Sequence, residues 1–120
     1  MIKNILLVGA GGALGSIARY TVTLLFTYFA ICSEWAILAT NIIGSFLIGL
    51  LFPMQGNSGY LFMAVGFCGG FTTFSTFSAQ ALNLFQTGQR TIAILYIAAS
   101  ISISIISVLL GIYCADKLIK

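Results

Sequence analysis

Four long apolar runs divide the chain, and they constrain its fold more than any other feature of the sequence. A helix of about 20 apolar residues crosses a bilayer, so we expect membrane spans over residues 4–30, 34–52, 59–85 and 91–115. Charged side chains make up 6% of the sequence, and all but Arg19 lie between these runs, beyond them or, in the case of Glu34, at the first residue of one. Too few polar residues remain to cover a water-soluble globule. The sequence therefore predicts an all-α membrane protein of four transmembrane helices, with residues 1–120 in a single transmembrane domain.

The number of spans and the flanking charges predict the topology. Four spans place both termini on one side of the membrane, where Lys3, Lys117 and Lys120 also lie, whereas Arg90 faces the other side. Because basic residues favour the cytoplasmic side, this small bias indicates cytoplasmic termini. We expect the first span to be retained rather than cleaved, since its apolar sequence continues beyond the roughly 7–15 residues of a signal peptide's hydrophobic region.

The segment GFCGGFTTFSTF, from Gly66 to Phe77, is unlike a plain lipid-facing helix. Glycine is a poor helix former, and threonine and serine bring polar atoms into hydrocarbon. We expect the helix to break at Gly69 and Gly70, which would free carbonyl groups for a hard cation and N–H groups for an anion. Irregular backbone is tolerated inside a membrane only where protein or water surrounds it, so this helix should be central and sheltered.

Two phenyl rings close the same segment. Phe74 and Phe77 lie three residues apart and therefore share one helix face. Rows of aromatic side chains are usually packing surfaces. A phenyl ring also has a positive edge, and a ring turned edge-on can contact an anion without offering a competing acceptor. Both rings are therefore candidate anion contacts as well as candidate core residues.

Two polar side chains fall inside other spans. Arg19 lies past the middle of the first span, where a cation costs about 2.5 to 3.5 kcal/mol on insertion scales. It either extends from a tilted helix to the membrane interface or attracts anions in an aqueous entry. Asn41 lies near the middle of the second span, and its amide either links two helices or donates hydrogen bonds to a ligand.

The last span carries a line of hydroxyl groups. Tyr96, Ser100, Ser104 and Ser107 follow one another at steps of four, four and three, which places them on one helical face. Each serine can bond back to a carbonyl four residues earlier or allow close packing. Four in a line are equally consistent with a polar track through the membrane.

Small residues four apart predict close approach between helices in three of the spans. Packing within one subunit and packing between two subunits both fit this pattern, although the small size of the domain favours an oligomer. The pairs are Gly11 with Gly15, Ser45 with Gly49, and Gly66 with Gly70.

The polar inventory excludes several functions. The chain has no histidine, and no Asp or Glu lies deep in a span, which argues against a proton relay or a cation-coupled exporter. Ser75 has no base at span depth, so a membrane serine hydrolase is not supported and we expect no enzyme. One cation, amide and hydroxyl donors, and phenyl edges remain. That set favours a small, strongly hydrogen-bonding anion.

Three segments resemble the CrcB or Fluc family of small bacterial fluoride channels. They are GGALGSIARY from Gly11 to Tyr20, TNIIGSFLIG from Thr40 to Gly49, and GFCGGFTTFSTF from Gly66 to Phe77. They occur in the family's order, with four spans, and the resemblance covers essentially the whole chain. The third segment is the most specific of the three.

The resemblance implies an antiparallel, dual-topology homodimer with two fluoride pathways at its interface. The residues matching Asn41, Phe74 and Phe77 line the pathway in this family, and those matching Ser75 and Thr76 coordinate ions or line the same route. The positions of Tyr96, Ser100 and Ser104 belong to the family's polar track. The arginine matching Arg19 either attracts anions or holds structure.

The resemblance also implies a cofactor and a mechanism. Carbonyl groups at the positions of Gly69 and Thr72, from both subunits, hold a structural sodium ion. The channel passively exports cytoplasmic fluoride across the bacterial inner membrane and so protects against fluoride toxicity. The implied partners are fluoride, the lipid bilayer and a second copy, with no nucleic acid. A proton-coupled fluoride transporter and a non-conducting membrane assembly subunit remain as alternatives.

Overall fold

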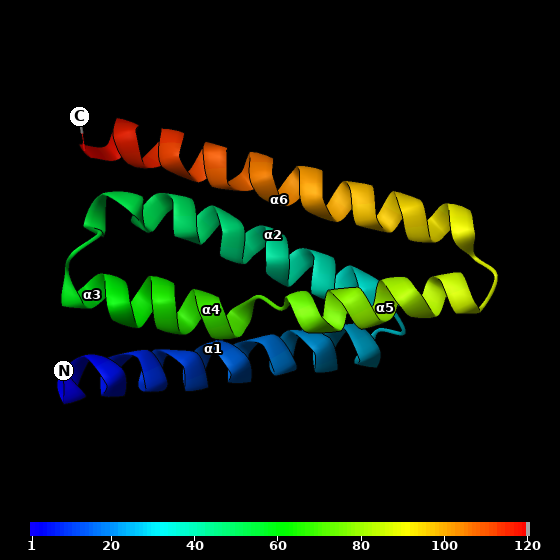
Figure 1. Cartoon of the computed structure of the whole chain (residues 1–120), viewed down its shortest axis with the longest axis horizontal. Coiled ribbons are helices and arrows are strands. Elements are labelled where there is room, and N and C mark those ends of the chain that lie inside the picture. Colours follow the sequence, from blue (N-terminus) through cyan, green and yellow to red (C-terminus); the bar gives the residue numbers. More distant parts are fainter. Residues whose placement is uncertain (120) are drawn as a thin grey trace.

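The computed structural model describes residues 1–119, so Lys120, which contributes to the expected charge bias, lies outside the described residues. Within that range the chain is all-helical, as predicted, and four helical stretches are long and apolar enough to cross a membrane. Figure 1 shows these stretches side by side along the long axis, with the start of the first and the end of the fourth at the same end of the molecule. The stretches are Ile2–Tyr28, Ser33–Met54, Ser58–Gln86 and Arg90–Ile119.

The stretches consist of the following elements. The first is α1 (Ile2–Tyr28), the second is α2 (Ser33–Leu51) with a 3₁₀ turn η1 (Phe52–Met54), and the fourth is α6 (Arg90–Ile119). The third contains α3 (Ser58–Tyr60), the π-helix η2 (Leu61–Cys68), α4 (Gly69–Phe71) and α5 (Phe74–Gln86). Pro53 lies at the point where α2 gives way to the 3₁₀ turn, since proline lacks the N–H that an α-helix needs.

The third stretch is irregular at a different place from the one expected. Gly69 has helical dihedral angles (φ −62°, ψ −37°), and Gly70 also lies within α4, so the expected break at these glycines is wrong. Instead, Thr72 (φ −86°, ψ 156°) and Thr73 (φ −149°, ψ 117°) are extended and separate α4 from α5. Gly70 has another use, because a Cβ there would overlap the carbonyl oxygen of Gly12 on α1.

Glycines bring α1 into backbone contact with η2 and α4. A Cβ on Gly11 would overlap the carbonyl oxygen of Phe62, and one on Gly15 would overlap that of Phe67. On the facing helix, a Cβ on Gly66 would lie 2.8 Å from the carbonyl oxygen of Val8. These contacts lie within one chain, so at least this use of the small-residue pairs is packing inside the subunit.

A second glycine contact joins α2 to α6. Cβ atoms on Gly49 and Gly111 would overlap the carbonyl oxygens of Val108 and Phe46, respectively. Figure 1 shows α6 running along α2, while α1 runs along η2 and α4 on the other side of the molecule. Helix α2 and the third stretch therefore form the centre, and α1 and α6 form the flanks.

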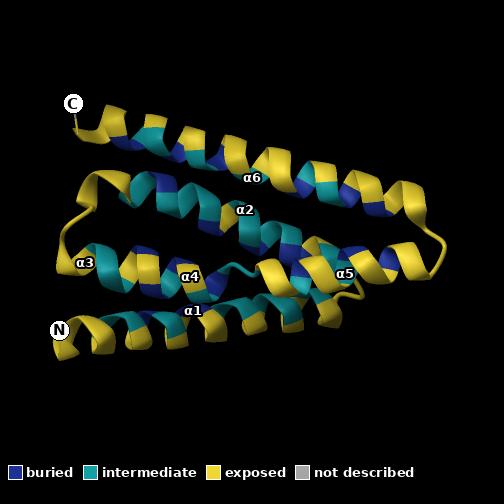
Figure 2. Cartoon of the chain, viewed as in Figure 1, coloured by how far each residue is buried: buried dark blue, intermediate teal, exposed yellow. Residues whose placement is uncertain are grey.

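Buried residues lie where the helices face one another (Figure 2). One hydrophobic cluster joins α2, α5 and α6 at the end of the molecule away from the termini. The outward surfaces of α1 and α6 are largely apolar and exposed, as expected of helices that face lipid. The buried cluster consists of Ile37, Phe77, Ala81, Leu84, Ala93 and Tyr96.

The glycine contacts predict a position-dependent effect of one added methyl group. Gly11→Ala should lower the free energy of unfolding by about 1–3 kcal/mol, because α1 and η2 must separate to admit the methyl group. Gly9→Ala is the matched control on the same helix, since no atom lies within 4 Å of its Cβ position. Reversible unfolding in mixed detergent measures both. Equal stability of the two variants would contradict the close contact.

Candidate functional site

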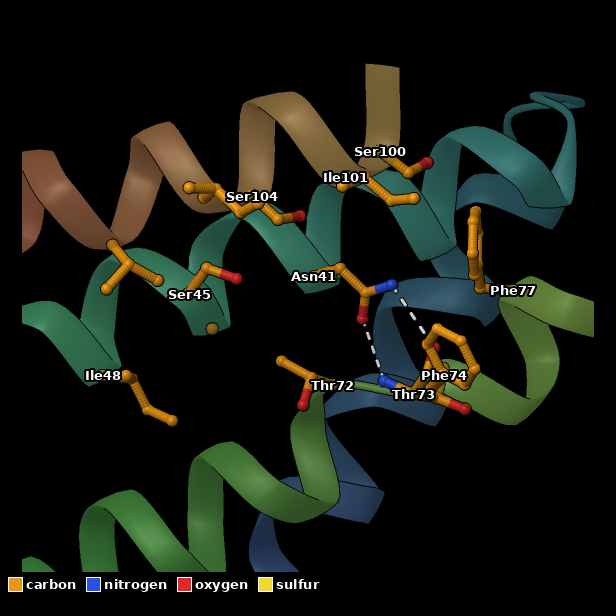
Figure 3. A pocket seen from close by; sticks show the side chains of 13 residues that line it. Asn41, Ser45, Ile48, Thr72, Thr73, Phe74, Phe77, Ser100, Ile101 and Ser104 are labelled. Carbon is orange, nitrogen blue, oxygen red and sulfur yellow. Dashed lines mark hydrogen bonds between the residues drawn. The ribbon is translucent and has the colours of Figure 1, made fainter. Parts of the chain in front are cut away.

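A groove of about 330 Å³ lies where α2 and α6 face the extended segment between α4 and α5 (Figure 3). Side chains from all three parts of the chain line it, so the helix packing described above creates it. It contains several polar groups of the spanning stretches together with apolar walls. The lining residues are Asn41, Gly44, Ser45, Ile48, Thr72, Thr73, Phe74, Phe77, Ser100, Ile101, Ser104, Ile105 and Val108.

Asn41 holds the extended backbone from across the groove. The N–H of Thr73 donates to Asn41 Oδ1 at 2.9 Å, and Asn41 Nδ2 donates to the carbonyl oxygen of Thr73 at 3.3 Å. Figure 3 shows this amide reaching from α2 to the segment below it. Because the amide nitrogen carries two hydrogens, one N–H remains for another acceptor. Asn41 thus links two helical stretches, the first of the two uses that the sequence left open, and keeps one N–H for the second.

Thr73 caps the helix that begins after it. Its Oγ1 accepts a hydrogen bond from the N–H of Thr76 at 3.2 Å and lies 3.3 Å from Ser75 Oγ. An N-terminal side-chain acceptor of this kind satisfies an N–H that has no partner within the helix. Sequence reasoning missed Thr73. The signal was present, since a threonine just before a helical run is a preferred cap.

The two phenyl rings differ in their surroundings. Their centroids are 5.7 Å apart, and the ring of Phe77 also lies 5.3 Å from that of Tyr96. Phe77 is 6% exposed and belongs to the buried cluster, whereas Phe74 is 77% exposed at the rim of the groove. Phe77 therefore has a packing role in the subunit. The exposure of Phe74 is not explained by packing within one chain.

The hydroxyl groups of α6 also divide into separate environments. Ser100 and Ser104 line the groove, whereas Ser107 donates to the carbonyl oxygen of Ile103 at 2.7 Å, the local bond that serines in helices often make. Ser100 is buried, and among the described residues its Oγ is the one buried side-chain polar atom without a hydrogen-bond partner. A buried unpaired hydroxyl costs roughly 1–3 kcal/mol. It requires an explanation beyond packing.

Tyr96 lies on the same face of α6 but does not line this groove. Its hydroxyl donates to Gln80 Oε1 at 2.7 Å, and Gln80 Nε2 donates to Ser33 Oγ at 3.2 Å. This chain of hydrogen bonds joins α6, α5 and the start of α2. Gln80 was missed in the sequence, although it lies three residues after Phe77 as a polar side chain within a span.

Arg19 points to the third stretch rather than to the membrane surface. Its Nε donates to the carbonyl oxygen of Gly70 at 3.1 Å, close to the last turn of α4. Thr72, by contrast, makes local hydrogen bonds, since both its N–H and its hydroxyl donate to the carbonyl oxygen of Cys68. Within residues 1–119, the carbonyl oxygens of Gly69 and Thr72 accept no hydrogen bond.

The remaining expected residues lie beside the groove rather than in its wall. Ser75 is exposed and Thr76 is half-buried in the first turn of α5, where Thr76 Oγ1 accepts from Thr73 Oγ1 at 3.2 Å. Gly69 is exposed on α4. The structure thus brings together six of the expected residues in one groove: Asn41, Thr72, Phe74, Phe77, Ser100 and Ser104. It leaves five outside the lining: Arg19, Gly69, Ser75, Thr76 and Tyr96.

The fold and the groove define a multi-pass membrane protein whose polar groups lie within its spanning stretches. The groove is lined by amide and hydroxyl groups together with phenyl rings and aliphatic side chains, and no carboxylate is among its lining residues. Residues 6–112 match the family described as CrcB-like protein, Camphor Resistance (CrcB). The chain belongs to this family.

Three relatives illustrate the similarity. The protein from Agrobacterium fabrum is 44% identical, over 90% of this chain and 92% of its own length. The protein from Chlorobaculum tepidum is 41% identical, over 85% of this chain and 86% of its own length. The protein from Saccharophagus degradans is 38% identical, over 95% of this chain and 90% of its own length. Each of these relatives is named fluoride-specific ion channel FluC.

The cap at Thr73 generates a test of how the extended segment is held. Thr73→Val should lower the free energy of unfolding by about 1 kcal/mol, since valine keeps the shape but loses the oxygen that accepts from Thr76. Thr73→Ser keeps the acceptor and should remain close to the natural chain. Detergent unfolding compares the two. A loss of stability in the serine variant as large as in the valine variant would show that the methyl group, not the cap, matters.

Proposed function

We propose that this chain is a fluoride-selective channel of the bacterial inner membrane that exports cytoplasmic fluoride passively and so protects against its toxicity. The observation that carries the proposal is the unpartnered hydroxyl of Ser100 in a groove that also holds Asn41 and Phe77. A small, strong acceptor without its water shell fits such donors. The names of the relatives support fluoride as that acceptor.

The groove suggests how selectivity would arise. Ser100, Ser104 and the free N–H of Asn41 would donate hydrogen bonds in place of water, while phenyl edges offer positive potential without competing acceptors. Chloride is larger and a weaker acceptor, so a narrow and nearly dry route would exclude it. Nothing in this scheme requires a proton carrier or a covalent intermediate. We propose that the protein is not an enzyme.

We further propose that two copies assemble antiparallel, with dual topology. Phe74 is 77% exposed at the rim of a groove that one chain leaves open, and a second copy would cover both. The bias of three lysines against one arginine departs from the near balance expected of dual topology, so the proposal rests on the open groove and not on the charges. In the assembled state, Phe74 from one copy would face the hydroxyl groups of the other, so each pathway would use both chains.

We also propose a structural sodium ion beside the extended segment. The carbonyl oxygens of Gly69, in α4, and of Thr72, in the extended segment, accept no hydrogen bond within the described residues, and carbonyl groups left free where a membrane helix is interrupted are typical ligands of sodium. One chain offers too few such groups for a complete site, whereas two copies would offer twice as many. Arg19 already binds the carbonyl of Gly70, so we propose that it holds α4 in place beside this site.

Two other functions make different predictions. A proton-coupled fluoride transporter needs a titratable group along the route, and no carboxylate lines the groove. Its current would change its reversal potential with the pH gradient, whereas a channel current reverses at the fluoride equilibrium potential. A non-conducting assembly subunit would show no fluoride flux as a pure protein. The unpaired Ser100 hydroxyl favours the channel over that subunit.

Fluoride efflux from liposomes that contain only this chain tests the function. We expect rapid efflux that does not require a proton gradient, and a roughly tenfold or greater loss in Phe74→Ile, a barrier change of about 1.4 kcal/mol. Phe74 is the sharper target, because its ring lies outside the buried cluster and its replacement leaves the packing inside the subunit unchanged. Phe77→Ile should also reduce the flux, but it removes a buried ring.

Phe85→Ile is the control for these measurements. Phe85 lies on the same helix, α5, and lines neither groove, so its replacement should leave efflux close to that of the natural chain. No efflux from the natural chain would overturn the channel. Efflux that is equal in the Phe74, Phe77 and Phe85 variants would keep the channel but remove the rings from its mechanism.

Ion replacement tests the sodium site, because no side-chain substitution removes a backbone carbonyl. We expect the melting temperature of the purified protein in detergent to rise with sodium chloride, as binding to the folded state alone stabilises it. N-methyl-D-glucamine chloride at the same ionic strength should have no such effect. Equal stabilisation by the two salts would argue against a sodium site and would leave the channel proposal unaffected.

A further inference from the structure

A second groove, of about 540 Å³, lies between the first turns of α2, the end of α5 and the first turns of α6. It is separated from the first groove by the ring pair of Phe77 and Tyr96, since Phe77 lines one groove and Tyr96 the other. The proposed fluoride route does not use it. Its lining residues are Cys32, Glu34, Trp35, Leu38, Leu84, Gln89, Ile92, Leu95, Tyr96 and Ala99.

The lining changes from polar to apolar along the groove. Glu34 lies in the first turn of α2, and Gln89 directly precedes α6, so both mark the end of the spanning region. Leu38, Leu95 and Ala99 follow at increasing depth, and the step from Ile92 to Ala99 corresponds to about 10 Å along a helix. Trp35 lies at the polar end, at a depth where tryptophan is enriched in membrane proteins.

This gradient matches the orientation of a phospholipid, whose head group lies at the interface and whose acyl chain points into the membrane. Glu34 is the one carboxylate in the lining, and it is half-buried. A carboxylate in that position favours a cation that can donate hydrogen bonds. Arg90, the residue after Gln89, supplies a positive charge at the same end of the molecule, which complements a phosphate.

We propose that this groove binds a zwitterionic phospholipid with a primary ammonium group, phosphatidylethanolamine. Glu34 contacts the ammonium group, and the acyl chain lies along the apolar part of the groove. An anion such as fluoride is a poor occupant, because Glu34 would repel it and the deeper walls offer no donor beyond Tyr96, whose hydroxyl donates to Gln80. An anionic lipid is disfavoured for the same electrostatic reason.

The position of the sole tryptophan makes the proposal measurable. Trp35 lines the groove, and the sequence contains no other tryptophan, so its fluorescence reports on this site. The chain is reconstituted into phosphatidylcholine vesicles that contain small amounts of lipid with brominated acyl chains, which quench nearby tryptophan. The brominated lipid carries an ethanolamine, choline or glycerol head group. Quenching at increasing mole fraction then gives the relative occupancy for each head group.

We expect brominated phosphatidylethanolamine to quench at a roughly two- to fivefold lower mole fraction than the other two lipids, the range that an interfacial ion pair gives. Glu34→Gln should abolish this preference. Asp116→Asn is the matched control, because it removes the chain's other acidic charge at a site that lines neither groove. Equal quenching by all three lipids in the natural chain would overturn the proposal, and so would a preference that survives Glu34→Gln.

A second pair of variants tests the acyl-chain part of the groove. Ala99→Leu adds bulk at its deep end and should weaken quenching by all three lipids, whereas Ala98→Leu changes an exposed position outside the lining. Equal quenching in these two variants would show that the lipid does not enter the groove. None of these measurements depends on fluoride flux, so the lipid site and the channel can fail independently.

Discussion

The structure depends on how the backbone N–H and carbonyl groups around two extended residues, Thr72 and Thr73, find hydrogen-bond partners in the middle of a membrane-spanning stretch. Hydrocarbon offers no partner for an open N–H or carbonyl group, so every such group at that depth needs one from the protein or from a ligand. Asn41 binds both backbone groups of Thr73, and Arg19 binds the carbonyl of Gly70. These contacts explain why polar side chains occur inside α1 and α2 despite their cost.

Helix packing places these polar side chains within reach. The glycine contacts draw α1 against η2 and α4 at backbone distance, which positions Arg19 next to Gly70. The contact between Gly49 and Gly111 does the same for α2 and α6, whose facing surfaces then form the wall of the first groove. Helix α2 contributes to both grooves as well. The close helix contacts at glycines thus bring the polar side chains within hydrogen-bonding distance of their partners.

The sequence predicted the parts of this fold that depend on local pattern. Hydropathy alone identified four spans, and the helical spacing of Ser100 and Ser104 placed them on one face, where they line the groove. The position of the irregular backbone was predicted wrongly. Helix propensity marks Gly70 as a breaker, but the approach of α1 requires a glycine there, and the extended residues are the threonines that follow.

The contacts of Gln80 could not be predicted from the sequence for a related reason. Its partners, Ser33 and Tyr96, come from two other helices, so its role depends on tertiary packing rather than on any motif. The difference in exposure between Phe74 and Phe77 also could not be predicted, because their spacing places both rings on the same helix face. Only the packing of α6 against α5 buries one ring and leaves the other open.

The bond between Asn41 and Thr73 has a consequence for evolution. Asn41 recognises the peptide group of residue 73, which every amino acid except proline presents in full, rather than its side chain. Substitutions at these two positions are therefore expected to be independent, even though the positions are in direct contact. Methods that infer contacts from correlated substitutions would overlook the link on which the third span depends. In related sequences we expect asparagine to be kept at position 41 while the residue at position 73 varies.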